Sequence, residues 1–163
     1  MTAGKRILLA TNKEDAIVLR QKTGPFDFSK FTKKDIRELV QSMRVTMKLA
    51  DGVGLSANQI GLNLSLFVAQ VDRKLHAVFN PKITKVSKDE DDMEEGCLSV
   101  PRTFGTVRRP TSIWLECQDA AGKKSKAKIQ GFLARVFQHE IDHLNGILFT
   151  DKAVDAYVVP EQS

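Results

Sequence analysis

Hydrophobic positions repeat with the period of an α-helix in two segments of the chain. Between residues 33 and 50, apolar side chains recur at three- and four-residue steps, which predicts an amphipathic helix near the N-terminus. Thr32 is expected to cap its first turn, and Gly52 follows its end. Residues 131–144 show the same period, and the pair Asn145-Gly146 predicts where this second helix stops.

Alternating hydrophobic and polar positions predict strands in much of the remaining chain. Residues 62–68 alternate in the manner of a strand with one buried face, whereas residues 52–61 before them are expected to form a loop. Because the strands do not alternate regularly with helices, we expect an α+β fold: antiparallel β-sheets packed around the second helix as the central one, with the first as an N-terminal helix. Further strands are predicted at 75–79, 82–86, 112–118 and near Ile129, with residues 119–122 as a hairpin turn.

The 163 residues are 42% hydrophobic and 28% charged, which is the composition of one globular domain, 1–163, and excludes a disordered chain. No run approaches the ~20 apolar residues that cross a bilayer, and the first residues resemble neither a signal nor a transit peptide. We therefore expect a cytoplasmic protein without membrane association. In a reducing compartment, its two cysteines would serve as ligands or nucleophiles more often than as a disulfide.

The formal net charge is +5, with acidic residues gathered at 89–95 and basic residues at 123–128. Both runs are expected to be solvated loops. A basic chain can bind nucleic acid, but one Trp and one Tyr offer little surface on which bases could stack. No direct nucleic-acid binding is therefore expected.

Two of the three histidines, His139 and His143, lie four residues apart in the second predicted helix. Residues at this spacing share one helical face, so the two imidazoles can bind the same ion. Glu140 stands at the position that the His-Glu-x-x-His pattern gives to a general base. The alternative is a pair of hydrogen-bonded histidines on a core helix.

A catalytic metal site of this kind needs a third protein ligand and an open position. Phe149 stands where the metzincin pattern would place another histidine, which excludes that pattern. His76 lies in a predicted strand, and Cys117 alternates with apolar positions and is expected to be a small core residue. The best candidate is Cys97, which follows Gly96. On ligand chemistry alone, a thiolate with two imidazoles suits zinc.

The chain resembles the peptide deformylases in three motifs that occur in family order. The resemblance implies a metal-dependent enzyme that removes the N-formyl group from N-formylmethionyl nascent peptides and releases formate. It implies one Fe(2+) per chain, replaceable by Zn(2+), Ni(2+) or Co(2+), with Cys97, His139 and His143 as ligands and Glu140 as the residue that moves the proton. The motifs are Gly52-Val53-Gly54-Leu55-Ser56-Ala57-Asn58-Gln59, Glu95-Gly96-Cys97-Leu98-Ser99 and Gln138-His139-Glu140-Ile141-Asp142-His143-Leu144.

The same resemblance implies roles for residues around the metal. The oxyanion would be stabilised by the side-chain amide of Gln59 and the backbone N–H of Leu98. Asp142 would support His143 and pair with Arg109. Arg135 stands at a position that is apolar in familiar bacterial members, so the preference for methionine as the first side chain of the substrate could differ here. Substrate would be held by backbone groups near Val53, Gly54 and Gly96, and by a methionine pocket that includes Met93, Phe132, Val136 and Arg135.

The implied partners are an N-formylated peptide and the ribosome near its exit tunnel, and the implied state is a monomer. Residues 151–163 include Pro160 and do not favour the long C-terminal helix of many bacterial members. Two alternatives remain at this point. One is a metallopeptidase that uses the same helix to cut internal peptide bonds. The other is a basic ribosome- or RNA-binding module with a structural metal, whose fourth ligand would be Cys117 or His76.

Overall fold

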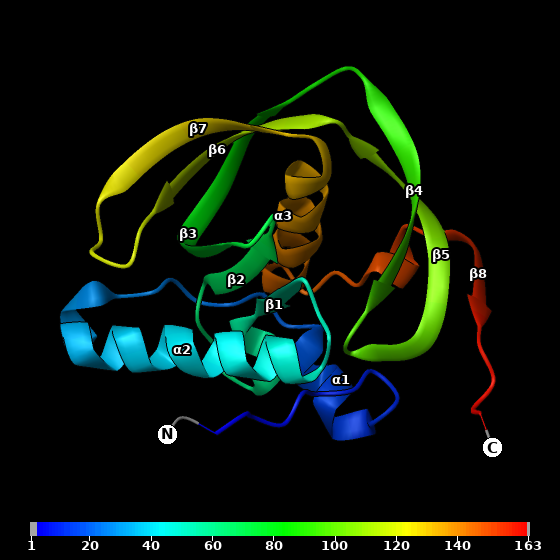
Figure 1. The fold of residues 1–163 in the computed structure, drawn as a ribbon, viewed down its shortest axis with the longest axis horizontal. Coiled ribbons are helices and arrows are strands. Elements are labelled where there is room, and N and C mark those ends of the chain that lie inside the picture. The colour runs from blue at the N-terminus through cyan, green and yellow to red at the C-terminus, as the bar shows by residue number, and fades with distance from the viewer. Residues whose placement is uncertain (1–2, 163) are drawn as a thin grey trace.

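The computed structural model describes residues 3–162 and places helix α3 between two β-sheets (Figure 1). The expected α+β class and both predicted long helices are confirmed, while a short helix, α1, was not predicted. In residues 3–162, the α-helices are α1 (Lys13–Leu19), α2 (Lys33–Leu49) and α3 (Gly131–Leu144), and the 3-10 helices are η1 (Phe28–Lys30), η2 (Ala57–Ile60) and η3 (Phe149–Asp151).

The ends of the two long helices are fixed by local hydrogen bonds. At the start of α2, the Thr32 hydroxyl accepts from the Asp35 backbone N–H at 3.0 Å, and the Asp35 carboxylate accepts from the Thr32 N–H at 2.9 Å. Helix α3 ends at Leu144 with Asn145 as its C-cap, and Gly146 follows with φ of +75°. A side chain at position 146 would collide with the Arg20 carbonyl oxygen, so the glycine also lets the N-terminal segment pass close to α3.

A five-stranded antiparallel sheet supports α3 from one side. The predicted strands 75–79 and 82–86 form a single strand, β3, with a register shift between Phe79 and Lys82. The loop expected at 52–61 instead contains a short strand and the 3-10 helix η2. In spatial order, the strands are β1 (Gly54–Ser56), β2 (Leu66–Val71), β3 (Lys74–Val86), β6 (Ser112–Gln118) and β7 (Lys124–Gln130).

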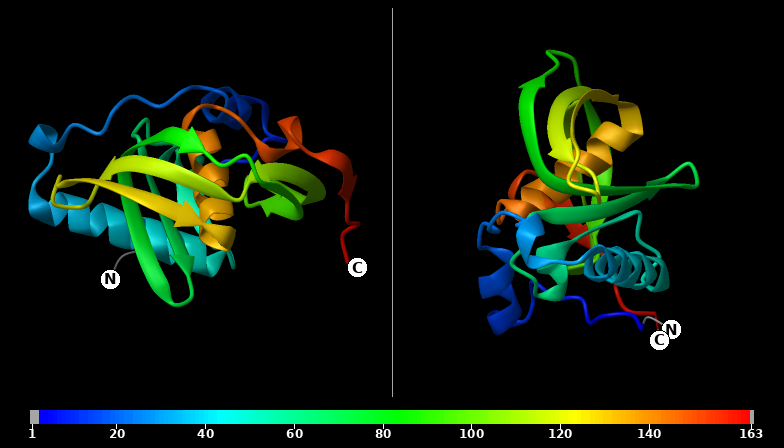
Figure 2. Two further views of the ribbon diagram at one scale, coloured as in Figure 1. Left: turned by 90° about the horizontal axis from the view of Figure 1, so that it is seen from above. Right: turned by 90° about the vertical axis from the view of Figure 1, so that its left-hand side faces the viewer.

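A second, three-stranded sheet lies on the other side of α3, away from the β6–β7 hairpin (Figures 1 and 2). Its first strand contains most of the acidic run, so the expected loop at 89–95 is wrong. Cross-strand pairing explains this, because Arg108 of the neighbouring strand lies 3.1 Å from Glu90 and 3.9 Å from Asp92. The strands are β4 (Glu90–Cys97), β5 (Val100–Pro110) and β8 (Val154–Val158).

The hydrophobic core is divided between the two faces of the five-stranded sheet. Phe67 packs with α3 on one face, while Leu66 and Val68 join the cluster beneath α2 on the other. All three side chains are fully buried, so the prediction of a one-sided strand at 62–68 is wrong in burial as well as in bounds. The basic run is likewise a strand, β7, rather than a loop, although its lysine side chains are exposed.

Within residues 3–162, no helix has both the length and the apolar character needed to cross a membrane.

Candidate metal centre and active site

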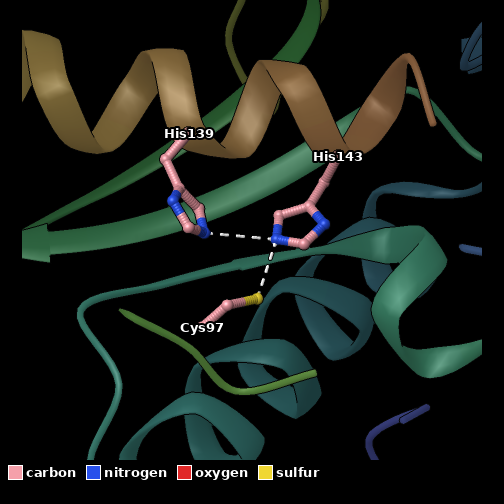
Figure 3. A group of neighbouring side chains, drawn as sticks. All are labelled: Cys97, His139 and His143. Carbon is pink, nitrogen blue, oxygen red and sulfur yellow. Dashed lines mark hydrogen bonds between the residues drawn. The ribbon is translucent and has the colours of Figure 1, made fainter. Parts of the chain in front are cut away.

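Cys97, at the end of β4, lies opposite the two histidines of α3 (Figure 3). Its Sγ is 3.2 Å from His143 Nε2, and this nitrogen is 3.2 Å from His139 Nε2. The three donor atoms lie within 4.8 Å of one another, so one cation can contact all three. Segments that are distant in the sequence therefore form a plausible ligand set for a single metal ion.

The backbone around Cys97 depends on the glycine before it. The β4–β5 register shifts between Gly96 and Cys97, where the chain turns tightly and Cys97 pairs with Val100. A Cβ at position 96 would lie 2.9 Å from the Phe104 ring. Glycine therefore allows this ring to pack against the strand that delivers the sulfur.

Glu95 orients His139 through the ring nitrogen that does not face Cys97 and His143. Its Oε1 is 2.8 Å from His139 Nδ1, which leaves Nε2 facing the other two donors. Arg109 donates to both carboxylate oxygens at 2.6 and 3.0 Å, and Arg135 donates to Oε2 at 2.6 Å. Burial would raise the pKa of Glu95, but hydrogen bonds from His139 and Arg109 outweigh it and lower the pKa to about 2.

The two arginines extend this buried network to both sides. Arg109 donates to Asp142 at 2.8 Å, which joins the two residues expected to support His143. Arg135 is only 4% exposed and donates to Asp91 at 2.8 Å as well as to Glu95. Although Arg135 lines the cleft, as expected for a pocket residue, its charge is directed at two carboxylates rather than into the cleft.

The environment gives the two histidines different protonation preferences. Burial, reinforced by the nearby charges of His139 and Arg109, lowers the pKa of His143 well below its ordinary value and favours the neutral imidazole that binds metals. Burial also lowers the pKa of His139, but interactions with Cys97 and Glu95 and the charge of Glu140 raise it to about 10. A bound cation would take the place of that proton.

Glu140 follows His139 on α3 and lines the same cleft. The side chain is buried, and its Oε2 has no hydrogen-bond partner among residues 3–162. Burial raises the pKa of Glu140 to about 7. The carboxylate fits against Gly54, where an added Cβ would lie 2.5 Å from Oε1. A buried carboxylate oxygen without a partner is costly, so its presence fits a site that receives a polar ligand.

Gln59 is held in one orientation by two serines. Its Oε1 accepts from the Ser56 backbone N–H at 2.9 Å and from the Ser56 hydroxyl at 3.0 Å. Its Nε2 donates to the Ser99 hydroxyl at 3.0 Å and lies 3.7 Å from Cys97 Sγ. The amide donor therefore faces the candidate metal ligands.

A cleft of about 620 Å³ opens over these groups. Leu98 lies in its wall beside Cys97, and the exposed side chains of Val53 and Phe132 stand at its edge. The remaining predicted binding residues line it too: Gly54, Met93, Gly96, Arg135 and Val136.

The other candidate ligands lie elsewhere. His76 packs edge-to-face against Phe137, with ring centroids 5.4 Å apart. Cys117 is half-buried at the edge of the core and 3.6 Å from the Ser125 hydroxyl, so the expectation of a core position is only partly correct. In residues 3–162, the metal-ligating cluster contains neither of them.

Sequence reasoning missed the roles of Glu95, Ser56 and Ser99. Glu95 stands directly before Gly96-Cys97, and this position was a usable signal. However, Glu95 is the one buried carboxylate of the acidic run 89–95, and its exposed acidic neighbours made it look like one of them. Ser56 lies three residues before Gln59, but Ser99 is 40 residues away from it. The contact between Gln59 and Ser99 could therefore be seen only in the folded structure.

Comparison with known proteins decides the family. A family model described as polypeptide deformylase matches residues 5–157. The chain belongs to the peptide deformylase family. It is 42% identical over 127 residues to a peptide deformylase of Synechococcus sp. strain CC9605, an alignment that covers 75% of this chain and 63% of that relative. The chain thus spans slightly less than two thirds of this relative's length.

Solved deformylase structures share the whole architecture. The deformylase of Thermotoga maritima is 34% identical with a TM-score of 0.85, and the match covers 93% of this chain and 99% of that one. A Met-Ala-Ser-bound deformylase of Acinetobacter baumannii is 29% identical with a TM-score of 0.85, and the match covers 93% and 99% of the two chains. The fold that carries the candidate site is therefore the deformylase fold.

Proposed function

We propose that this chain is a metal-dependent peptide deformylase, which hydrolyses the formyl amide of N-formylmethionyl peptides to formate and a free amine. One observation carries the proposal: the donor atoms of Cys97, His139 and His143 converge within 4.8 Å at a cleft where Glu140 is buried. Membership of the deformylase family supports it.

Cys97, His139 and His143 would hold one divalent cation. The family resemblance favours Fe(2+), with Zn(2+), Ni(2+) or Co(2+) as substitutes, and the thiolate–imidazole set is compatible with each. When bound, the ion would activate a water molecule and polarise the formyl carbonyl. Because no other His, Cys, Asp or Glu joins these three in residues 3–162, a coordination position remains for water or substrate.

The chain's own residues would handle the proton and the developing negative charge. Glu140, with its pKa raised to about 7, can accept a proton from the attacking water near neutral pH and deliver it to the leaving amine. The fixed amide of Gln59 and the backbone N–H of Leu98 would donate to the oxygen of the tetrahedral intermediate. Since Ser56 holds the Gln59 oxygen, the amide group needs no reorientation.

The cleft fits an extended peptide with an apolar first side chain. Backbone groups near Val53, Gly54 and Gly96 would pair with the peptide. Met93, Phe132 and Val136 would contact the methionine side chain. Because Glu95 and Asp91 neutralise Arg135, we expect preference for methionine to persist. The Met-Ala-Ser ligand of the A. baumannii relative is of the product class that this proposal requires.

We further propose that residues 1–163 act as one catalytic domain, as a monomer in a bacterial-type cytoplasm, on peptides newly made by ribosomes. The family membership supports this setting. The alternative of a structural metal lacks support, since His76 and Cys117 lie outside the ligand cluster of residues 3–162. Internal peptide cleavage is not favoured by the deformylase relatives.

The test is formate release from formyl-Met-Ala-Ser by anaerobically prepared, iron-loaded protein. Glu140→Gln should lower kcat by about 10²–10⁴-fold because a proton carrier is lost, while metal content stays unchanged. Glu38→Gln, an exposed substitution on α2, is the matched control and should retain activity. Absence of formate, full activity of Glu140→Gln, or cleavage of unformylated peptide would reject the proposal.

A further inference from the structure

Five lysines lie on one exposed face of the five-stranded sheet, at the end formed by β3, β6 and β7. The register aligns Lys82, Glu116 and Lys126 in one row across the three strands, and Lys85, Trp114 and Lys128 in another. Directly paired residues share a face of the sheet. We call this surface the lysine face, and its lysines are Lys82, Lys85, Lys124, Lys126 and Lys128, all exposed.

The positive charge of this face is largely uncompensated. Glu116 forms an ion pair with Lys126 at 3.1 Å, and it is the one carboxylate that pairs with the lysine face within residues 3–162. The ammonium groups of Lys85 and Lys128 lie 4.7 and 5.0 Å from the centre of the Trp114 ring, which supports their position without neutralising their charge. The face therefore concentrates positive charge at one end of the molecule.

The lysine face also contains a groove. Its volume is about 390 Å³, and three lysines and one carboxylate are among the residues that line it: Asn80, Lys82, Glu116, Cys117, Gln118, Lys124, Ser125 and Lys126. Helix α2 contacts β1 and β2, and its hydrophobic cluster extends to Phe79 of β3 but includes no residue of β6 or β7. Phe26 and Phe28 reach the edge of this surface at Asn80 and Gly122, but the five lysines are exposed. A concave, basic surface of this kind is suited to an extended anionic partner.

We propose that the lysine face binds the phosphate backbone of RNA. Lys124, Lys126 and Lys128 alternate along β7 at about 6.6–6.8 Å per two residues, so they present a regular row of point charges to a polymer with regularly repeated charge. The face contains no arginine, whose planar fork would favour bidentate contact with bases, so binding should be independent of sequence. From the sequence, we expected no direct nucleic-acid binding, because the chain has few aromatic residues on which bases could stack. Contact with the phosphate backbone does not require aromatic residues.

The choice of RNA among polyanions rests on the proposed function, because a peptide that still carries its formyl group is found beside the RNA of the machinery that made it. The lysine face and the metal centre do not compete for space. The β6–β7 hairpin lies on the opposite side of α3 from β4 and β5, which carry Cys97 and the cleft wall (Figures 1 and 2). A peptide and an RNA can therefore be bound at once.

The experiment measures binding of the metal-loaded protein to a short fluorescent RNA duplex by anisotropy, from about 50 to about 200 mM KCl. The test variant is Lys82→Gln/Lys124→Gln/Lys128→Gln. The control, Lys13→Gln/Lys22→Gln/Lys48→Gln, removes the same charge from exposed positions outside the lysine face. Trp114, the only tryptophan, gives an independent signal, since RNA on this face should change its fluorescence in the control variant.

We expect the test variant to bind at least about tenfold more weakly at low salt, and the slope of log K against log[KCl] to become shallower by about 1 per lysine removed. The control should bind like the unmodified protein, and all three should release formate equally from a short peptide. Equal weakening in both variants, unchanged Trp114 fluorescence, or preference for a DNA duplex or polyglutamate over RNA would overturn the proposal. If the protein binds RNA but releases no formate, the proposed deformylase function is rejected while the proposed RNA binding by the lysine face stands.

Discussion

At the scale of single residues, the predictable part of the site is the part made of rare residue types. The chain has three histidines and two cysteines, so the spacing of His139 and His143 was informative and Cys97 had few competitors. Carboxylates are common, and the one sequence signal that separated Glu95 from its acidic neighbours was its position directly before Gly96-Cys97. Its importance comes from burial and from its contacts with His139 and two arginines, which exist only in the folded chain.

Gly54 is needed at its position because Glu140 occupies the space of a side chain. In Gly54→Ala, the new Cβ would approach Glu140 Oε1 to 2.5 Å and push the carboxylate aside. A displacement of this kind should lower kcat/KM by about 100-fold while the metal stays bound. Steady-state kinetics and metal analysis test this. The control is Gly24→Ala, whose added Cβ meets no atom nearer than 3.8 Å and should leave both quantities unchanged.

At the scale of elements, helices were predicted more accurately than strands. The apolar period and end signals located α3 at its observed bounds and α2 to within one residue. Strand β4 was missed because its side chains are largely exposed and charged. Strand β5 was missed because its hydrophobic and polar residues do not alternate clearly. Both strands are paired with each other across the sheet, which a linear pattern does not reveal. Strand β8 pairs with β5, far away in sequence, and was missed for the same reason.

The capping box of α2 should be measurable as stability. Thr32→Ala removes the acceptor for the Asp35 N–H and should lower the free energy of unfolding by about 1 kcal/mol. Thr32→Ser keeps the hydroxyl and should retain most of this free energy of unfolding. Urea unfolding monitored by circular dichroism gives both values. If the serine variant loses as much stability as the alanine variant, the hydroxyl is not the source of the effect.

At the scale of the whole molecule, the N-terminal segment ties the two halves of the active site together. The Leu8 N–H donates to the Gln59 carbonyl at 2.7 Å, and the Ala10 N–H donates to the Ser99 carbonyl at 2.8 Å. Asp15 anchors this segment by accepting from Arg6 at 2.8 and 2.9 Å and from the Leu9 N–H at 2.9 Å. The backbone of Gln59, the proposed oxyanion donor, and that of Ser99, two residues after the candidate ligand Cys97, are therefore held by one short stretch of chain.

The hydrogen bonds of Asp15 should make the stability of the fold depend on pH in the acidic range. The hydrogen bond from Arg6 and that from the Leu9 N–H lower the pKa of Asp15 from 3.8 to about 2. A lowered pKa means that the unfolded chain takes up the proton first, so Asp15 stabilises the fold above pH 3.8 and loses this effect as the pH falls toward 2. The urea midpoint of Asp15→Asn should lie below that of the unmodified protein at neutral pH. The gap should close across this acidic range, and a gap independent of pH would contradict the assignment.

The positions of the candidate metal ligands along the chain determine the order in which they are synthesised. Cys97 leaves the ribosome well before His139 and His143, and residues 7–10 must wait for Ser99 before both of their bonds can form. A chain translated only to residue 138 thus has both thiols, Cys97 and Cys117, but neither histidine of the candidate ligand set. If the proposed function holds, each copy could bind its ion only after residue 143 has been released, so an unfinished chain would not yet be active.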